Sequence, residues 1–299
     1  MHQHADQPVI VVGIDGSPSA TNAVEVAARL ADRCGAVIRP VTAWQYPATA
    51  ALPGGPDPVS AEVMDERAST AINRAIDEVR GRGVVIDERC LVDRIIARGP
   101  AAGAILDAAD PSVGLVVLGR RGLGGLEGIL LGSVSRRVTE LAVVPVMLVG
   151  ERAVDLSGPI VLGVDASDEA ARARAWAGEM AAVLGVGVVV VHGIAGLPME
   201  VPPSAIDHIW ARGRRLAEDH AVVLQTADPA PVSVDIEVDI ADPRHLLART
   251  AAARGASMVV IGSRGEGTAA GVLAGTVVSR IMQLDECPVV IVTTDTESR

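Results

Sequence analysis

The stretch "VVLGRRGLGGLEGILLGSVSRR", Val116 to Arg137, begins as an apolar strand and continues as a glycine-rich loop that leads into a helix. A second copy, "VVIGSRGEGTAAGVLAGTVVSR", runs from Val259 to Arg280. Strand, loop and helix in succession form the repeating unit of parallel α/β folds. The two loops align as G-x2-G-x9-G-[ST], with Gly119, Gly122, Gly132 and Ser133 in the first copy and Gly262, Gly265, Gly275 and Thr276 in the second.

The repeat extends to the whole chain. "PVIVVGIDGSPSA" at Pro8–Ala20 returns as "PIVLGVDASDEA" at Pro159–Ala170, and each copy ends in a short apolar strand after a proline. The 299 residues therefore divide into two domains, 1–150 and 158–299, joined by the polar segment Gly150–Gly158.

Each copy alternates aliphatic strands with helical stretches, which predicts parallel βαβ units with right-handed crossovers. The chain contains no Phe, one Tyr and three Trp, so its core must consist of Val, Ile, Leu and Ala, as is typical of a parallel sheet covered on both faces. Ser17 followed by Pro18 predicts a helix start, and Ser204 with Asp207 resembles a capping box. The expected strands are 9–14, 36–42, 89–96, 115–118 and 146–149, then 160–164, 186–192, 233–240, 258–261 and 289–292, and the first copy's expected helices are 20–33, 61–81, 101–109 and 133–141.

Composition excludes several classes of function. All 26 basic residues are Arg, which excludes a P-loop lysine and a Schiff base. The net charge of −11 argues against nucleic acid or an anionic membrane as partner. The N-terminus lacks a signal-peptide pattern, and the longest apolar run, at 181–191, is too short to span a bilayer. With three scattered cysteines, the chain is expected to be cytoplasmic.

The strongest sequence signals of both copies follow strands, which is where ligands bind in parallel sheets. Asp15 and Asp165 follow the first strand of each copy. Glycines allow a close approach of the backbone to a ligand, and the helix that starts at Gly132-Ser133 offers free N–H groups to an anion. The alternative is that both loops are ordinary turns whose glycines solve only backbone problems. The Walker and dinucleotide fingerprints fit poorly, because Lys is absent and no G-x-G-x-x-G follows a first strand.

Taken together, the strand ends Ile14–Ser17 (I-D-x-S) and Val164–Ser167 (V-D-x-S), the two glycine loops, "LGSVSRRV" and the proline-led last strands resemble a tandem universal stress protein. The resemblance covers nearly the whole chain and implies two Rossmann-like domains, each a five-stranded parallel sheet of order 3-2-1-4-5 between helices. It also implies an ATP site in each domain. Val41, taken as following strand 2, would meet adenine through its backbone. The implied nucleotide-binding residues are Gly13, Ile14, Asp15, Val41, Gly119, Arg121, Gly122, Gly132, Ser133, Val134 and Ser135, and, in the second copy, Gly163, Val164, Asp165, Gly193, Gly262, Arg264, Gly265, Gly275, Thr276 and Val277.

The Asp, Arg and Trp side chains near the implied sites each allow two interpretations of their role. Asp15 and Asp165 either contact a ribose hydroxyl or a magnesium ion near the phosphates, or cap the first helix. The arginines of the loops, Arg121 and Arg264, either bind phosphate or are solvated. Trp44 either packs or stacks on adenine, and packing is the favoured reading. At the position of Ser135 the second copy has Val278, which weakens the second site.

No nucleophile–base pair is apparent, so the chain is expected to be an ATP-binding regulator or sensor in stress response and not an enzyme. Two alternatives stay open: a nucleotide-independent interaction module, and a slow ATPase of the same fold. An adenine nucleotide and an unidentified protein are the expected partners. The last apolar strands, Pro145–Val149 and Pro288–Val292, are expected to pair either with each other within the chain or between two chains in a homodimer, because an open apolar edge is a liability.

Overall fold

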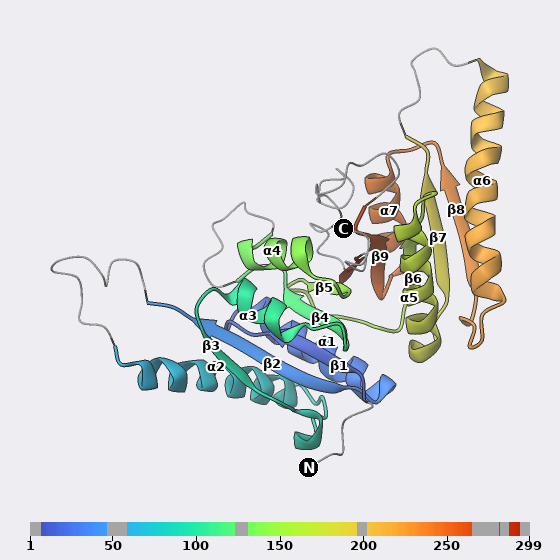
Figure 1. Cartoon of the computed structure of the whole chain (residues 1–299). Helices are drawn as coiled ribbons and strands as arrows, with labels where there is room; N and C mark the ends of the chain where they lie inside the picture. The colour runs from blue at the N-terminus through green and yellow to red at the C-terminus, as the bar shows by residue number, and fades with distance from the viewer. Residues whose placement is uncertain are drawn as a thin grey trace, which may run out of the picture. The chain divides into compact units, whose positions relative to one another are not determined.

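The computed structural model describes residues 7–46, 59–122, 131–195, 202–264, 281 and 287–293. The chain separates into two compact units, Met1–Glu151 and Arg152–Arg299, which we call unit 1 and unit 2. Each unit is an α/β domain built on a parallel sheet (Figure 1). The predicted fold class is therefore confirmed.

The sheet of unit 1 has the strand order β3-β2-β1-β4-β5, and every pair of neighbours is parallel. Strands β1 and β4 lie side by side at its centre. From β1 the chain adds β2 and β3 on one side, and from β4 it adds β5 on the other side, so the order in which strands are added reverses between β1 and β4. This order is the predicted 3-2-1-4-5. The strands are β1 (Val9–Gly13), β2 (Val37–Trp44), β3 (Ile95–Arg98), β4 (Val113–Gly119) and β5 (Val146–Val149).

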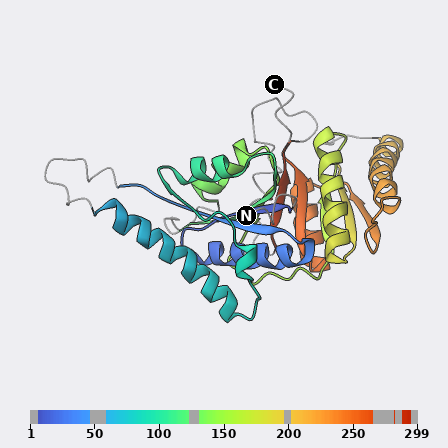
Figure 2. The same cartoon turned by 60° about the horizontal axis from the view of Figure 1, so that its bottom comes forward.

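Four helices cover the two faces of this sheet. Figure 2 shows α1 (Pro18–Cys34) and α2 (Ala61–Gly81) on one face, with α3 (Ala101–Ala108) and α4 (Ser133–Leu141) on the other. The N-cap of α1 is Ser17, whose side chain accepts a hydrogen bond from the Ala20 amide, and Pro18 follows it as predicted.

Unit 2 repeats the same topology, with the strand order β8-β7-β6-β9-β10. Helix α5 packs beside α6, whereas α7 contacts β6, β7 and β9. The described elements are β6 (Ile160–Gly163), α5 (Asp168–Leu184), β7 (Val188–Gly193), α6 (Pro203–Gln225), β8 (Val234–Asp239), α7 (Pro243–Arg254), β9 (Met258–Gly262) and β10 (Val289–Val292).

The core of each unit consists of aliphatic side chains, as the composition predicts. All four residues of β5 are buried, as are all four of β10. Burying such side chains stabilises a fold by about 1.5–3 kcal/mol each relative to exposure. Both faces of β5 and β10 are covered, which explains why these two strands are continuously apolar, whereas β8 at the edge of its sheet alternates apolar and acidic residues.

Two sequence predictions were wrong in detail. The strand expected at 89–96 is replaced by a short 3-10 helix, η2 (Glu88–Cys90), and the strand begins only at Ile95. The Asp87 side chain accepts from the Arg89 amide and so starts that turn, and Asp93 has a positive φ of 42°, which interrupts the extended chain. The proposed capping box at Ser204 does not form, because Pro202 is the N-cap and Ser204 lies inside α6.

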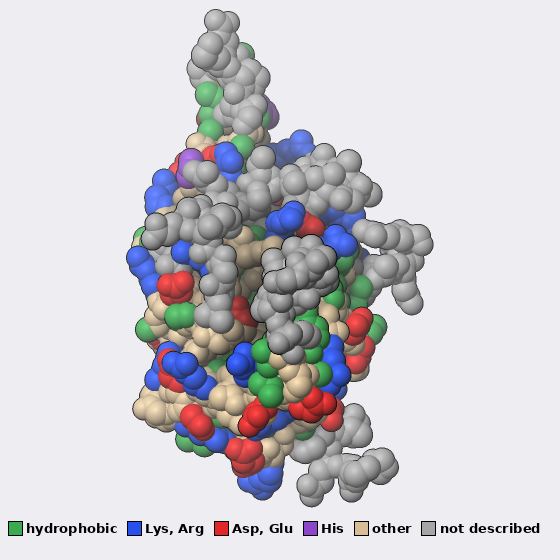
Figure 3. Space-filling model, turned by 90° about the vertical axis from the view of Figure 1, so that its left-hand side faces the viewer, with side chains coloured by type: hydrophobic (Ala, Val, Ile, Leu, Met, Phe, Trp, Pro, Cys, Tyr) green, Lys and Arg blue, Asp and Glu red, His purple; other side chains and the backbone are tan. Residues whose placement is uncertain are grey.

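The surface carries charges of both signs. On the face seen in Figure 3, acidic and basic side chains are interspersed. Within the described ranges, no helix combines the length and the apolar character needed to cross a membrane.

Candidate functional site

A cavity of about 580 Å³ lies at the carboxyl ends of β1, β2 and β4 in unit 1. All eleven residues that the sequence assigned to the first site line it: Gly13, Ile14, Asp15, Val41, Gly119, Arg121, Gly122, Gly132, Ser133, Val134 and Ser135. The sequence reasoning missed eight other lining residues: Ala20, Thr42, Ala43, Ala101, Ile105, Leu118, Leu131 and Arg136. The α3 residues among these had no motif to reveal them, whereas Arg136 directly follows one.

The turn after β1 is fixed by its own side chains. Oδ1 of Asp15 accepts a 2.9 Å hydrogen bond from the Ser17 amide. Since Ser17 is the N-cap of α1, Asp15 does not have the capping role that was its alternative reading. Asp15 shapes the turn and lines the cavity.

The loop after β4 rests on the start of α1. The carbonyl oxygen of Arg121 accepts hydrogen bonds from Ser19 Oγ at 2.5 Å and from Ser17 Oγ at 3.2 Å. A Cβ on Gly119 would come within 2.5 Å of Ser19 Oγ, and one on Gly122 within 2.4 Å of Asp15 Oδ2. Gly119 leaves no room for a side chain, because a Cβ there would also lie 2.8 Å from the backbone nitrogen of Ala20, whereas a Cβ on Gly122 would require the Asp15 carboxylate to move.

Helix α4 begins at the same cavity. Its N-cap is Gly132, which provides no side-chain cap, and the Gly132 amide donates to the carbonyl of Arg120 at 2.9 Å. Ser133 is exposed, whereas Ser135 is buried and donates a 2.7 Å hydrogen bond to the Gly119 carbonyl. The first amide groups of a helix lack intrahelical acceptors, so this end can receive an anion.

The strand register corrects two assignments. Val41 lies inside β2 and not after it, and its carbonyl accepts a 2.8 Å hydrogen bond from the Ile14 amide. In unit 2 the same bond joins Val164 to Val191, so Val191 and not Gly193 is the counterpart of Val41. Gly193 lies two residues further along, at the end of β7.

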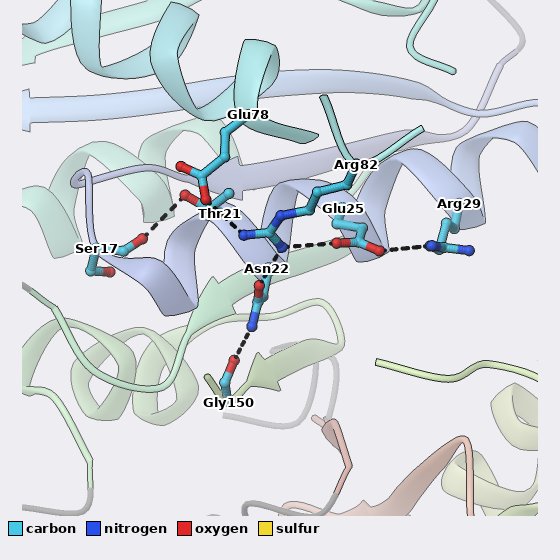
Figure 4. A network of polar contacts seen from close by, with 8 residues as sticks. All are labelled: Ser17, Thr21, Asn22, Glu25, Arg29, Glu78, Arg82 and Gly150. Carbon is cyan, nitrogen blue, oxygen red and sulfur yellow. Dashed lines mark hydrogen bonds and ion pairs between the residues drawn. The ribbon is translucent and has the colours of Figure 1, made fainter. Parts of the chain in front are cut away.

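A polar network anchors α1 to the rest of unit 1 (Figure 4). The buried Asn22 donates to the carbonyl of Gly150 at 3.0 Å and accepts from Arg82 Nη1 at 2.8 Å. Arg82 also pairs with Glu25 at 2.9 Å, and Arg29 pairs with the same carboxylate at 2.8 Å. Burial raises the pKa of Glu25, but the hydrogen bonds from the two arginines outweigh it and hold the pKa below its ordinary value.

Unit 2 brings part of the second predicted site together. Gly163, Val164 and Asp165 end β6 and enter the turn before α5, and Gly262 and Arg264 follow at the end of β9. Asp165 Oδ1 accepts from the Ser167 amide at 3.0 Å, as Asp15 does from Ser17. The remaining predicted residues, Gly265, Gly275, Thr276 and Val277, lie outside the described residues.

Two contacts of unit 2 have no counterpart among the described residues of unit 1. Glu169 forms an ion pair with Arg264, with 3.4 Å between Oε1 and Nε. The buried His220 ring lies within hydrogen-bond distance of the Asp165 carbonyl and of Arg174, at 3.3 Å each. Burial first, and then the charge of Arg174, hold the pKa of His220 below its ordinary value.

Trp44 packs within unit 1, in line with the favoured reading. Its Nε1 donates to Asp65 at 2.7 Å, and the Arg98 guanidinium lies 5.5 Å from the ring centroid. The ring of Tyr46 meets it edge-on at 5.2 Å. The indole of Trp44 therefore makes contacts on several sides within unit 1.

In the described parts of the chain, no group of three or more His, Cys, Asp or Glu side chains is arranged to hold a metal.

Comparison with known proteins agrees with this architecture. Residues 8–150 and 157–293 each match the model of the universal stress protein family. A universal stress protein of Mycolicibacterium smegmatis is 33% identical over 309 residues, covering 98% of this chain and 99% of the relative. Another, Rv1996 of Mycobacterium tuberculosis, is 29% identical and covers 94% of each chain.

Solved structures support the fold alone. A universal stress protein from Archaeoglobus fulgidus superposes with a TM-score of 0.68 at 18% identity, covering 96% of this chain and 99% of its own. One from Pseudomonas aeruginosa gives 0.64 at 16% identity, with 97% and 94% covered. The two matches to the family model and the relative at 33% identity show that the chain belongs to the universal stress protein family, with two family domains in tandem.

Proposed function

We propose that unit 1 binds ATP in the strand-end cavity and that the chain acts as a nucleotide-dependent regulator in stress response. The observation that carries the proposal is the cavity itself, which gathers every residue assigned to the first site from three separate parts of the sequence. Its volume of about 580 Å³ falls within the range of small-molecule pockets, about 300–1,000 Å³.

The phosphate end of the proposed site is the start of α4. The uncapped helix N-terminus at Gly132 and the exposed hydroxyl of Ser133 are suited to phosphate oxygens. Arg121 and Arg136 also line the cavity, and guanidinium groups bind phosphate without the lysine that this chain lacks.

The adenosine end has a different character. Ile14, Val41, Ala43, Ala101 and Ile105 present apolar surface, as flat nucleobases require. Asp15 lines the cavity with its carboxylate against Gly122, and there it would hold a ribose hydroxyl or, with the phosphates, a magnesium ion.

A regulatory role fits this arrangement better than catalysis. Among the described residues that line the cavity, none is a His, Cys or Lys that would act as nucleophile or general base. Slow ATP hydrolysis is the alternative activity of the same site. A nucleotide-independent interaction module is the alternative in which the cavity has no ligand.

Isothermal titration of the full chain with ATP, with and without magnesium, tests the proposal. The informative variant is Gly122→Ala, because its Cβ would displace the Asp15 carboxylate. Gly103→Ala in α3 is the matched control, because a Cβ there meets nothing within 4 Å. We expect Gly122→Ala to weaken binding by about tenfold or more and the control to bind as wild type. Absence of binding at high micromolar ATP would contradict the proposal.

A further inference from the structure

The same strand ends carry different charges in the two units. We propose that the nucleotide binds in unit 1 alone, and that Glu169 is the specificity-determining residue that excludes it from unit 2. This inference rests on the proposed ATP binding in unit 1 and restricts it to one of the two copies.

Ser19 and Glu169 occupy equivalent places. Each lies two residues after the N-cap serine of its helix. Each also lies against the glycine that ends the fourth strand of its unit: a Cβ on Gly119 would meet Ser19 Oγ at 2.5 Å, and one on Gly262 would meet Glu169 Cβ at 2.7 Å. A neutral hydroxyl in unit 1 is thus replaced by a carboxylate in unit 2.

The Glu169 carboxylate forms an ion pair with Arg264, the arginine of unit 2 that would otherwise be available to a phosphate. Glu169 Oε1 lies 3.4 Å from Nε of Arg264, and the two side chains are only 15% and 30% exposed. The counterpart, Arg121, lines the cavity and forms no ion pair with any side chain in the described part of the chain. In unit 2 a phosphate would have to displace a carboxylate of its own charge sign that is paired with Arg264 and only partly exposed to water.

The helix that follows the first strand adds to the difference. The first turn of α5 contains Asp168 and Glu169, whereas the first turn of α1 contains no acidic residue. Acidic side chains compensate the positive end of a helix and so remove part of its attraction for an anion.

The sequence that follows the second glycine loop also makes unit 2 less suited to an anion. Arg136, which lines the cavity of unit 1, aligns with Ser279 in the second copy. At the aligned positions named here, unit 2 therefore has two more acidic side chains, Asp168 and Glu169, and one fewer basic side chain than unit 1. A polyanionic ligand discriminates between sites on this basis more strongly than a neutral one does.

Photolabelling of the full chain with 8-azido-ATP, followed by cleavage at arginine and mass spectrometry, tests this assignment. In the wild type we expect label that ATP competes away in peptides of Met1–Glu151 only. In Glu169→Ser and in the closer isostere Glu169→Gln, we expect label in peptides of unit 2 to rise by about tenfold or more. Glu179→Gln, at an exposed position of the same helix, is the matched control and should label as wild type.

The outcomes separate the two proposals. Equal labelling of both units in the wild type overturns the exclusion from unit 2 but leaves ATP binding in unit 1 intact. No competed label in either unit overturns ATP binding and the exclusion with it. Unit 2 remaining unlabelled in both Glu169 variants, with circular dichroism unchanged, overturns the assignment of the exclusion to Glu169.

Discussion

The side-chain hydroxyl of Ser135 donates a 2.7 Å hydrogen bond to the backbone carbonyl of Gly119. Ser135 lies in the first turn of α4 and is 5% exposed, whereas Gly119 is the last residue of β4. The bond therefore closes the loop whose two ends line the cavity. It also gives Ser135 a positioning role, in contrast to Ser133, which is exposed two residues earlier.

From this contrast we predict that Ser135→Ala lowers the free energy of unfolding by about 1 kcal/mol, the usual effect of losing one hydrogen bond. Ser133→Ala should change it by less than about 0.5 kcal/mol, because its hydroxyl is exposed to water. Urea denaturation of both variants measures the difference. Equal losses of stability would show that the bond to Gly119 does not stabilise the loop.

Gly119 and Gly114, which both lie in β4, test whether the close approach of β4 to α1 requires a glycine. A Cβ on Gly119 would come within 2.8 Å of the Ala20 backbone nitrogen, so Gly119→Ala must displace α1. We expect it to destabilise unit 1 by about 1–3 kcal/mol, the typical cost of overpacking. Gly114→Ala has its nearest neighbours at 3.8 Å, an ordinary contact, and should not destabilise. Thermal unfolding of the two variants distinguishes them, and equal melting temperatures would contradict the prediction.

The Glu25 carboxylate should make stability depend on pH. Its pKa in the folded chain lies below the ordinary value of 4.5, so its contribution is complete above that pH and is lost as the pH falls through the folded-state pKa. We expect Glu25→Gln to lower the free energy of unfolding by about 2 kcal/mol at neutral pH, because Arg29 and Arg82 lose a charged acceptor. The difference from wild type should shrink below pH 4.5.

Urea denaturation of wild type and Glu25→Gln at neutral pH and near pH 3 measures this dependence. Glu66→Gln, at an exposed position of α2, serves as the control for the loss of a negative charge at the surface. A difference between wild type and Glu25→Gln that stays constant across the pH range would contradict the assignment to the ion pairs.

The fold was predictable because its signals are local and repeated. Aliphatic strands, the Ser17-Pro18 helix start and the duplicated glycine loops each specify one element, and the duplication identifies equivalent positions. Strand β3 was misplaced because the Asp87 side chain accepts a hydrogen bond from the Arg89 amide and so forms a turn, which the pattern of apolar residues does not reveal. The α3 side of the cavity, Ala101 and Ile105, and the pairing of Glu169 with Arg264 depend on contacts between distant segments, and no motif encodes them.

A Trp44 variant can distinguish a packing role of the indole from a direct contact with the ligand. Its indole donates to Asp65 and contacts Arg98 and Tyr46, which belong to unit 1 outside the cavity lining. We therefore predict that Trp44→Phe changes ATP affinity by less than about twofold, as expected for a residue that does not contact the ligand. The same variant should lower the melting temperature, because Phe cannot donate to the Asp65 carboxylate. Titration calorimetry and thermal unfolding of one preparation measure both quantities, and a large loss of affinity at an unchanged melting temperature would instead place the indole against the adenine.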